Sequence, residues 1–240
     1  MMRADEGSTQ IIFVSFSGID GAGKSTQILR FRAKMEQAGL RCLVVSFWDD
    51  VSRFKGLREG ASHVIFKGDR GVGTPSAPIT RRDKNVRSWM MTVVRLCIYF
   101  ADAVSTRSLM RRLARSNANV VIFDRFIYDE LANLNLETAA IRAYARMIAG
   151  IVPQPNISFL LDADPAEARA RKPEYPLDFL QFSRRSYFEL NDLIGSMTVI
   201  AALPAEEVER EISNRAESAL FIAPTRGASD QGQYLVESAR

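Results

Sequence analysis

The sequence is poor in the residues that build metal centres and disulfide frameworks. Its 240 residues include one histidine, His63, and two cysteines, Cys42 and Cys97. One cysteine falls in an expected strand and the other in an expected helix, which is not the pattern of a disulfide framework. His63 has no partner residues at metal-ligand spacing. We therefore expect no protein-bound metal cluster and a reducing, cytoplasmic environment.

Long apolar runs and a strong charge excess are also missing. No segment approaches the roughly 18 apolar residues of a membrane-spanning helix, and the first ten residues are polar, so we expect a soluble protein that is not exported. The net charge is +4, from 32 Lys and Arg against 28 Asp and Glu. This excess suits small anionic substrates but is too small to predict nucleic-acid binding. The sequence contains no Asn-Lys-x-Asp guanine-reading motif, which disfavours a GTPase switch.

What the sequence does contain is a phosphate-binding loop. Residues 18–25, Gly-Ile-Asp-Gly-Ala-Gly-Lys-Ser, match the pattern G-x-x-x-x-G-K-[ST] at every fixed position. The apolar run 11–16 precedes the loop, and the stretch 25–37, which has no glycine or proline, follows it. The loop is therefore predicted to join a strand to a helix, which is the context in which this pattern binds nucleotide phosphates.

Each residue type in this loop contributes to phosphate binding for a chemical reason. Glycines lack a Cβ, so the backbone can take positive φ angles and bring its N–H groups against phosphate oxygens. The side chain of Lys24 is expected to reach the β- and γ-phosphates, and the hydroxyl of Ser25 is expected to ligate Mg²⁺. The loop thus predicts a nucleoside triphosphate with magnesium. The predicted phosphate-binding residues are Gly18, Gly21, Ala22, Gly23, Lys24, Ser25 and Thr26.

The alternation of strand-like and helix-like segments predicts the fold. Apolar runs typical of buried strands occupy residues 11–16, 41–47, 120–124, 157–162 and 198–202, with helical patterns between them. The pattern indicates an α/β protein of the P-loop NTPase type, in which a doubly wound, five-stranded parallel sheet carries helices on both faces and a small lid. The long helical stretch 86–115 is expected to bend or divide near Ser105 and Thr106.

We expect one domain over residues 11–220 and a loose polar tail over 221–240. Within the domain, residues 47–87 break the pattern with five glycines and two prolines, and they carry nine basic against five acidic residues. This basic insertion is interpreted either as a solvated segment or as a flap that closes on an anionic acceptor. The lid is expected over about residues 165–180.

Charged residues follow the later strands. Asp124 ends its apolar run and is followed by Arg125, so both are expected at the carboxyl edge of the sheet, where open α/β sheets bind ligands. There Asp124 is suited to water-mediated contact with Mg²⁺. A basic cluster opens the predicted lid, either as a solvated helix face or as a source of cations for the transferring phosphoryl group. It consists of Arg169, Arg171 and Lys172.

With these motifs placed, the chain resembles the thymidylate kinase family of nucleoside monophosphate kinases over residues of about 11–220. The likeness rests on residues 16–27 around the loop, on Asp124-Arg125, and on residues 161–167, Leu-Asp-Ala-Asp-Pro-Ala-Glu. The resemblance implies transfer of the γ-phosphoryl group of ATP, with Mg²⁺, to a nucleoside monophosphate. Thymidylate (dTMP), converted to dTDP, is the acceptor that it favours.

The resemblance also implies roles for individual residues. Asp20 would face the sugar hydroxyl of the acceptor, Arg125 the acceptor phosphate, and Asp124 the magnesium. The lid would supply the catalytic arginines, because the loop has none at Gly21-Ala22. The catalytic residues predicted in this way are Lys24, Asp124, Arg125, Arg169 and Arg171.

Two departures from the family pattern concern the acceptor. Residues 47–50, Phe-Trp-Asp-Asp, stand where family members carry a Phe-Pro-x-Arg-type sequence, and Ala103 stands where they carry an arginine. Another cation would then have to hold the acceptor, and the candidates are Arg81 and Arg82, with Arg87, in the basic insertion.

Alternative functions stay open at this point. One is a kinase of the same fold for another small phosphate- or hydroxyl-bearing acceptor, and another is a nucleotide-binding regulator without turnover. The expected partners are ATP and a small anionic acceptor, with no nucleic acid and no membrane. For the oligomeric state, a homodimer is one option.

Overall fold

The computed structural model describes residues 11–51 and 89–222, and its centre is one parallel sheet. The strand order is β2-β3-β1-β4-β5. Each strand overlaps an apolar run identified in the sequence, with β1 extending one residue past its run, so the predicted five-stranded parallel sheet is confirmed. The strands are β1 (Ile12–Ser17), β2 (Cys42–Ser46), β3 (Val120–Asp124), β4 (Ile157–Leu161) and β5 (Thr198–Ile200).

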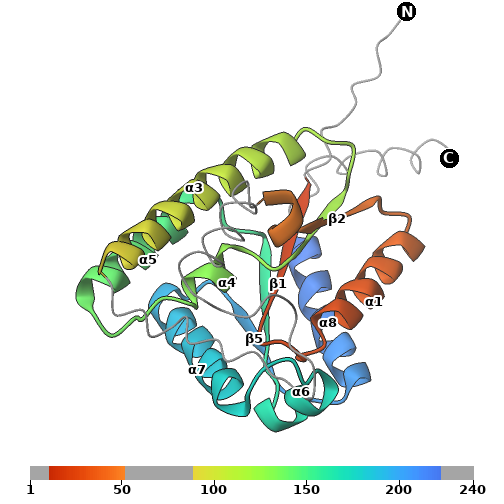
Figure 1. Ribbon diagram of the computed structural model, residues 1–240. Helices are drawn as coiled ribbons and strands as arrows, with labels where there is room; N and C mark the ends of the chain where they lie inside the picture. Colours follow the sequence, from red (N-terminus) through yellow and green to blue (C-terminus); the bar gives the residue numbers. More distant parts are fainter. Residues whose placement is uncertain (1–10, 52–88, 223–240) are drawn as a thin grey trace, which may run out of the picture.

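Helices cover both faces of this sheet (Figure 1). The helices α1 and α8 pack together on one face, while α3, α4, α5 and α7 lie on the other. Because both faces are covered, the central strands are continuous apolar runs, and β4 is buried along its whole length. The helices are α1 (Lys24–Gln37), α3 (Trp89–Leu113), α4 (Ile127–Leu131), α5 (Ala139–Ile151), α6 (Pro165–Arg171), α7 (Leu177–Ile194) and α8 (Ala205–Ile222), with a π-helix, η1 (Phe47–Val51), after β2.

The helices differ from the sequence expectations in two places. Helix α3 is continuous, so a division near Ser105 and Thr106 is wrong, while the alternative of a bend stays a prediction. The Thr106 hydroxyl donates to the carbonyl oxygen of Asp102 one turn earlier, at 2.7 Å, so it is satisfied without interrupting the helix. Helix α4 was not predicted, since its five residues are too few to show a helical period.

Parts of the predicted organisation lie outside the described residues. Of the basic insertion over 47–87, only residues 47–51 are described, and of the tail over 221–240, only residues 221 and 222. Over the two described ranges, no helix has both the length and the apolar character required to cross a bilayer.

The register of the sheet aligns the carboxyl ends of its central strands. Phe16 of β1 lies opposite Asp124 of β3 on one side and opposite Phe159 of β4 on the other. The Phe16 ring is fully buried and packs against Phe159 and against Phe31 of α1. This core fixes the point at which the chain leaves β1 to form the phosphate loop.

The loop after β1 packs backbone against backbone on β4 and α6. A Cβ atom at Gly18 would lie 2.5 Å from the carbonyl oxygen of Leu161, and one at Gly21 would lie 2.3 Å from the carbonyl oxygen of Ala168. Such distances are too short for any side chain, so only glycine allows this approach. The loop is therefore in direct contact with the first helix of the predicted lid.

This close approach can be tested by comparing two glycines of the same backbone conformation. Gly21 and Gly23 both have φ +83°, but a Cβ at Gly23 would meet nothing within 4 Å. Gly23→Ala is expected to lower the free energy of unfolding by about 1–2 kcal/mol, the penalty of a left-handed conformation. Gly21→Ala should lower the free energy of unfolding by at least about 1 kcal/mol more than Gly23→Ala, because the added methyl group would overlap the backbone of α6. Urea denaturation of both variants measures the difference, and equal losses would contradict the contact.

Candidate active site

The phosphate loop has the backbone shape that anion binding requires. Gly18, Gly21 and Gly23 all have positive φ angles, of 140°, 83° and 83°. Gly23 caps the N-terminus of α1, which begins at Lys24 and runs for 14 residues. Backbone N–H groups at such a helix start, together with the positive end of the helix dipole, favour bound phosphate. Ser25 and Thr26 are exposed in the first turn of α1.

The Lys24 side chain lies across the loop rather than in solvent. It is 7% exposed, and its Nζ donates to the carbonyl oxygens of Gly18 and Ile19, both at 2.8 Å. Burial, and then the charge of Arg125, lower the pKa of Lys24 to about 8 against the opposing effect of nearby carboxylates. The lysine is thus held at the phosphate site by neutral backbone acceptors. Its contact with the β- and γ-phosphates stays a prediction.

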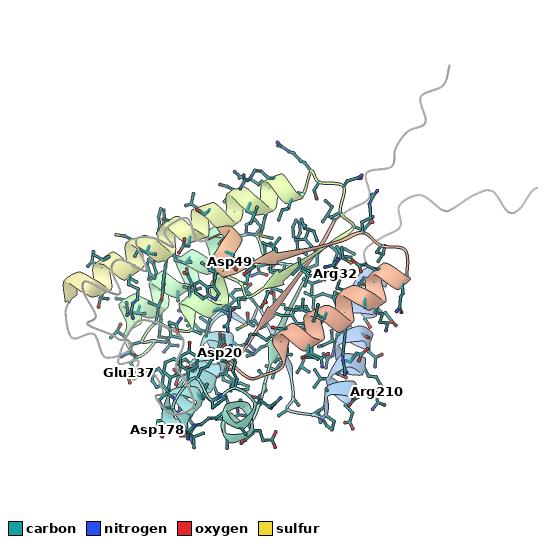
Figure 2. All side chains as sticks on the ribbon, turned by 45° about the vertical axis from the view of Figure 1, so that its right-hand side comes forward. Asp20, Arg32, Asp49, Glu137, Asp178 and Arg210 are labelled. Atoms are coloured by element: carbon teal, nitrogen blue, oxygen red, sulfur yellow. The ribbon has the colours of Figure 1, made fainter. Side chains whose placement is uncertain are left out.

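Two predicted acceptor residues, Asp20 and Arg125, form an ion pair with each other. Figure 2 shows Asp20 between the start of α1 and helix α7. Burial alone would raise the pKa of Asp20, but the charges of Arg125, Lys24 and Lys172 outweigh it and lower that pKa. Among the residues that the structure describes, Arg125 is the only non-glycine residue with a positive φ angle, 69°.

Arg125 also contacts a buried carboxylate that sequence reasoning missed. Its Nη1 donates to Oδ1 of Asp129 at 3.0 Å, and Asp129 is 2% exposed. Burial alone would lower the pKa of Arg125, but Asp129, Tyr187 and Asp20 raise it. The four-residue spacing from Arg125 to Asp129 is a weak helical signal, and it was hidden because α4 was not predicted.

Asp124 is placed where a metal ligand was predicted. It ends β3 in register with Phe16 of β1 and Ser46 of β2, and it is partly buried. Its negative charge is close enough to Lys24 to raise the pKa of that lysine. Residues 11–51 and 89–222 contain no group of three or more His, Cys, Asp or Glu that could hold a metal by itself. A cation here would need oxygen ligands from a bound nucleotide, which is how Mg²⁺ is usually held.

The region predicted as the lid begins with a well-capped short helix, α6. The Asp164 carboxylate accepts from the backbone N–H groups of residues 166 and 167, at 2.8 and 3.0 Å, and Pro165 occupies the first turn. The helix therefore starts where the sequence predicted, and the region expected as the lid, about 165–180, contains α6 and the start of α7.

The three basic lid residues have different surroundings. Arg171 pairs with Glu167, and Lys172 pairs with Glu174 at 3.2 Å while also lowering the pKa of Asp20. Arg169 is exposed and makes no ion pair within the described ranges. The catalytic roles predicted for Arg169 and Arg171 stay predictions.

A cavity of about 370 Å³ adjoins the phosphate loop, and neither Asp20 nor Arg125 belongs to its wall. Ala22 of the loop forms part of its wall, and so does Arg171 of the lid. The wall is completed by residues from the ends of β4 and β5, from α6, and from the turn into α8 and its first turns: Leu161, Asp162, Ala163, Glu167, Ile200, Ala201, Ala202, Leu203, Pro204, Ala205 and Val208.

A two-pronged ion pair between Asp162 and Arg184 supports this wall and was also missed. Arg184 donates through Nε to Oδ1 and through Nη2 to Oδ2 of Asp162, both at 2.6 Å. The guanidinium also lies over the ring of Phe188, 5.3 Å from its centroid. The pair ties the end of β4 to α7.

The structure does not test the predicted acceptor role of the arginines in the basic insertion. Arg81 and Arg82 lie outside the described residues. Ala103 is fully buried in α3, so this position offers neither a cation nor open space for one. The prediction that a cation of the basic insertion replaces the family's arginine therefore stays a prediction.

The fold and the geometry of this site define the class of protein to which the chain belongs. A parallel sheet in this order, with a phosphate loop after β1 and an aspartate at the end of β3, is a P-loop nucleotide-binding protein. No family model matches the chain.

Comparisons with known proteins narrow the class. A probable thymidylate kinase from Archaeoglobus fulgidus is 31% identical over 216 residues, which cover 87% of this chain and 96% of that protein. A thymidylate kinase from Bifidobacterium longum (strain DJO10A) is 27% identical over 190 residues, 75% of this chain and 83% of that one. A solved structure of thymidylate kinase from Candida albicans matches with a TM-score of 0.57 and 13% identity, over 87% of this chain and 92% of that chain.

The chain belongs to the thymidylate kinase family. The archaeal relative establishes this membership, and the solved structure supports the fold. The predicted family resemblance and the P-loop NTPase fold class are thereby confirmed.

The buried position of Lys24 predicts that nucleotide binding depends on pH. With a pKa of about 8 in the ligand-free protein, Lys24 is charged at pH 7 and largely neutral at pH 9. Bound phosphate favours the charged form, so ATP binding should take up a proton above pH 8 and weaken about tenfold between pH 7 and 9. Calorimetry in buffers of different ionisation enthalpy measures this uptake. Proton uptake that is unchanged in Lys24→Gln would contradict the assignment.

Proposed function

We propose that the protein transfers the γ-phosphoryl group of ATP to thymidylate, producing dTDP and ADP. The observation that carries the proposal is that one loop contributes to two sites. Ala22 of the loop borders the cavity, whereas Asp20 of the same loop pairs with Arg125, and neither residue of that pair is in the cavity wall. A donor in the cavity and an acceptor at the Asp20–Arg125 pair would have their phosphates meet near Lys24.

The donor base is assigned to the cavity beside Ala22. A volume of about 370 Å³ is within the range of small-molecule sites, and the alanine, leucine and proline residues after β5 suit the faces of a planar base. The triphosphate would extend from this cavity over the loop N–H groups to Lys24. Three charged residues also line the wall: Asp162 is bonded to Arg184, and Glu167 and Arg171 pair with each other.

The residues at the loop and at the end of β3 fit a magnesium ion bound with the triphosphate. The exposed hydroxyl of Ser25 and the carboxylate of Asp124 are hard oxygen donors on neighbouring elements, which suits Mg²⁺. The ion supplies neutralisation of charge on the β- and γ-phosphates when it is bound. Ser25 and Asp124 are proposed to hold it.

The acceptor is assigned to the side of Arg125. The guanidinium would bind the acceptor phosphate, and Asp20 would contact the sugar. Catalysis would then consist of positioning and charge neutralisation, with lid cations Arg169 and Arg171 acting on the transferring group. Both cysteines are free, which agrees with a reducing cytoplasm as the proposed location.

The proposal is tested by release of ADP from ATP and thymidylate in a coupled assay. The parent protein should turn over thymidylate, and Asp124→Asn should lower kcat about 100-fold or more with less than about a fivefold change in ATP affinity, because charge develops mainly in the transition state. Asp192→Asn serves as the matched control, since Asp192 is exposed in α7 outside the predicted lid, and it should keep parental kcat.

A panel of other nucleoside monophosphates and nucleosides separates the alternatives. Turnover with another acceptor and none with thymidylate would replace the acceptor in this proposal. ATP binding without turnover of any acceptor would instead favour the nucleotide-binding regulator.

We also propose that the protein forms a homodimer through α3. Its buried face contains Tyr99, Ala103 and Met110, but its other face carries a second apolar stripe. Val93, Phe100 and Val104 are 47%, 46% and 44% exposed, and exposed Cys97 lies between them. The 4-3-4 spacing of this stripe is typical of helices that pack against each other.

The apolar stripe on α3 predicts that one added negative charge prevents dimer formation. Phe100→Glu should shift the protein to a monomer in analytical ultracentrifugation, because a carboxylate would be buried without a partner. Leu29→Glu, on α1 at the opposite face of the sheet, changes an even more exposed residue and should leave the mass unchanged. A parent that sediments as a monomer would refute the dimer.

A further inference from the structure

We infer that Asp129 and Tyr187 are positioning residues that set the affinity for the acceptor by holding Arg125 in place. This inference rests on the proposed function, in which Arg125 binds the acceptor phosphate. It assigns no contact with substrate to either residue. Their effect would pass entirely through the guanidinium of Arg125.

The Asp129 carboxylate is the centre of a buried hydrogen-bond network. Its Oδ2 accepts from the Ser17 hydroxyl at 2.7 Å and from the backbone N–H of Phe126 at 3.1 Å. Its Oδ1 accepts from the Tyr187 hydroxyl at 2.6 Å and from Arg125 Nη1 at 3.0 Å. All four partners are donors, so the two oxygens have their lone pairs in use.

This network fixes both the backbone and the side chain of Arg125. The backbone N–H of Arg125 donates to the carbonyl oxygen of Phe16 at 3.0 Å, and its φ of 69° turns the chain sharply out of β3. A positive φ angle is unfavourable for arginine, so surrounding contacts must stabilise it. Asp129 supplies them at both ends, through the N–H of Phe126 and through Nη1.

The pairing of Arg125 leaves donors for an anion. A guanidinium has five N–H groups, and the contacts with Asp129 and Asp20 use one on each terminal nitrogen. The Nε–H and one N–H on each terminal nitrogen stay available for a phosphate. Because a two-pronged phosphate contact requires the fork at a set angle, the angle fixed by Asp129 decides how well the acceptor fits.

Tyr187 connects this arginine to the helix after the lid. It is 6% exposed in α7, and its hydroxyl shares Oδ1 of Asp129 with Arg125. Burial, and then the charge of Asp129, raise the pKa of Tyr187 well above its usual value. The hydroxyl therefore stays protonated and donates at all physiological pH values. Helix α7 also packs against α6.

The test separates the Michaelis constants of the two substrates. Tyr187→Phe removes one donor from Oδ1 and should raise the KM for thymidylate about 3- to 10-fold. Asp129→Asn should raise it about 10- to 100-fold, because either amide orientation sets a donor against Arg125 or against the N–H of Phe126. In both variants the KM for ATP should rise less than the KM for thymidylate, because neither Asp129 nor Tyr187 is in the wall of the cavity assigned to the donor.

A matched variant controls for general loss of packing. Tyr144→Phe removes the same atom from a tyrosine whose hydroxyl donates to the carbonyl oxygen of Leu96 in α3. It should leave both Michaelis constants at the parental values while lowering the melting temperature as much as Tyr187→Phe. Equal rises of the two Michaelis constants in Tyr187→Phe, or no rise in either variant, would overturn the inference.

Crystal structures of Asp129→Asn and Tyr187→Phe give a readout that needs no acceptor. The inference expects the Arg125 guanidinium to move from its position between Asp20 and residue 129. If the parent does not phosphorylate thymidylate, the proposed function fails, and the position of Arg125 in these structures still decides the positioning role. An unmoved arginine in both variants would refute that role.

Discussion

The active site depends on the parallel hydrogen bonding of β1 between β3 and β4. Because the strands run in the same direction and are in register at Phe16, Asp124 and Phe159, three connecting segments leave the sheet at one edge. The first is the phosphate loop, the second begins at Arg125, and the third contains Asp162. Residues more than a hundred positions apart in the chain thereby contact each other, as Asp20 and Arg125 do.

Much of this architecture could be predicted from the sequence, because its signals are local. Five apolar runs predicted five strands, and the phosphate loop carries its own pattern of glycines and lysine. Asp124 was recognisable because it ends such a run. Pro165 likewise marked the start of α6. Each of these signals lies within a few residues of the structure that it predicts.

The parts that were not predicted depend on contacts distant in the chain. Tyr187 and Asp129 are 58 residues apart, and Arg184 and Asp162 are 22 apart, so no periodicity links either pair. The direction of the Lys24 side chain depends on two carbonyl groups whose positions follow from the loop conformation. The fully buried state of Ala103 depends on how the helices pack on one face of the sheet. Such features appear only when the tertiary structure is known.

The bonds between Lys24 and the loop carbonyls mean that an incoming phosphate competes with the protein for the ammonium. Two of its three N–H donors already form hydrogen bonds of 2.8 Å with the carbonyl oxygens of Gly18 and Ile19, so an anion that requires more than one donor has to displace a carbonyl oxygen. A small, weakly basic anion gains too little from one hydrogen bond to do so. A polyphosphate chain offers several oxygens at once, and it also engages the N–H groups of the loop. The loop therefore keeps its conformation in the presence of chloride and binds polyphosphates in preference to small anions, with Lys24 held in place before a nucleotide binds.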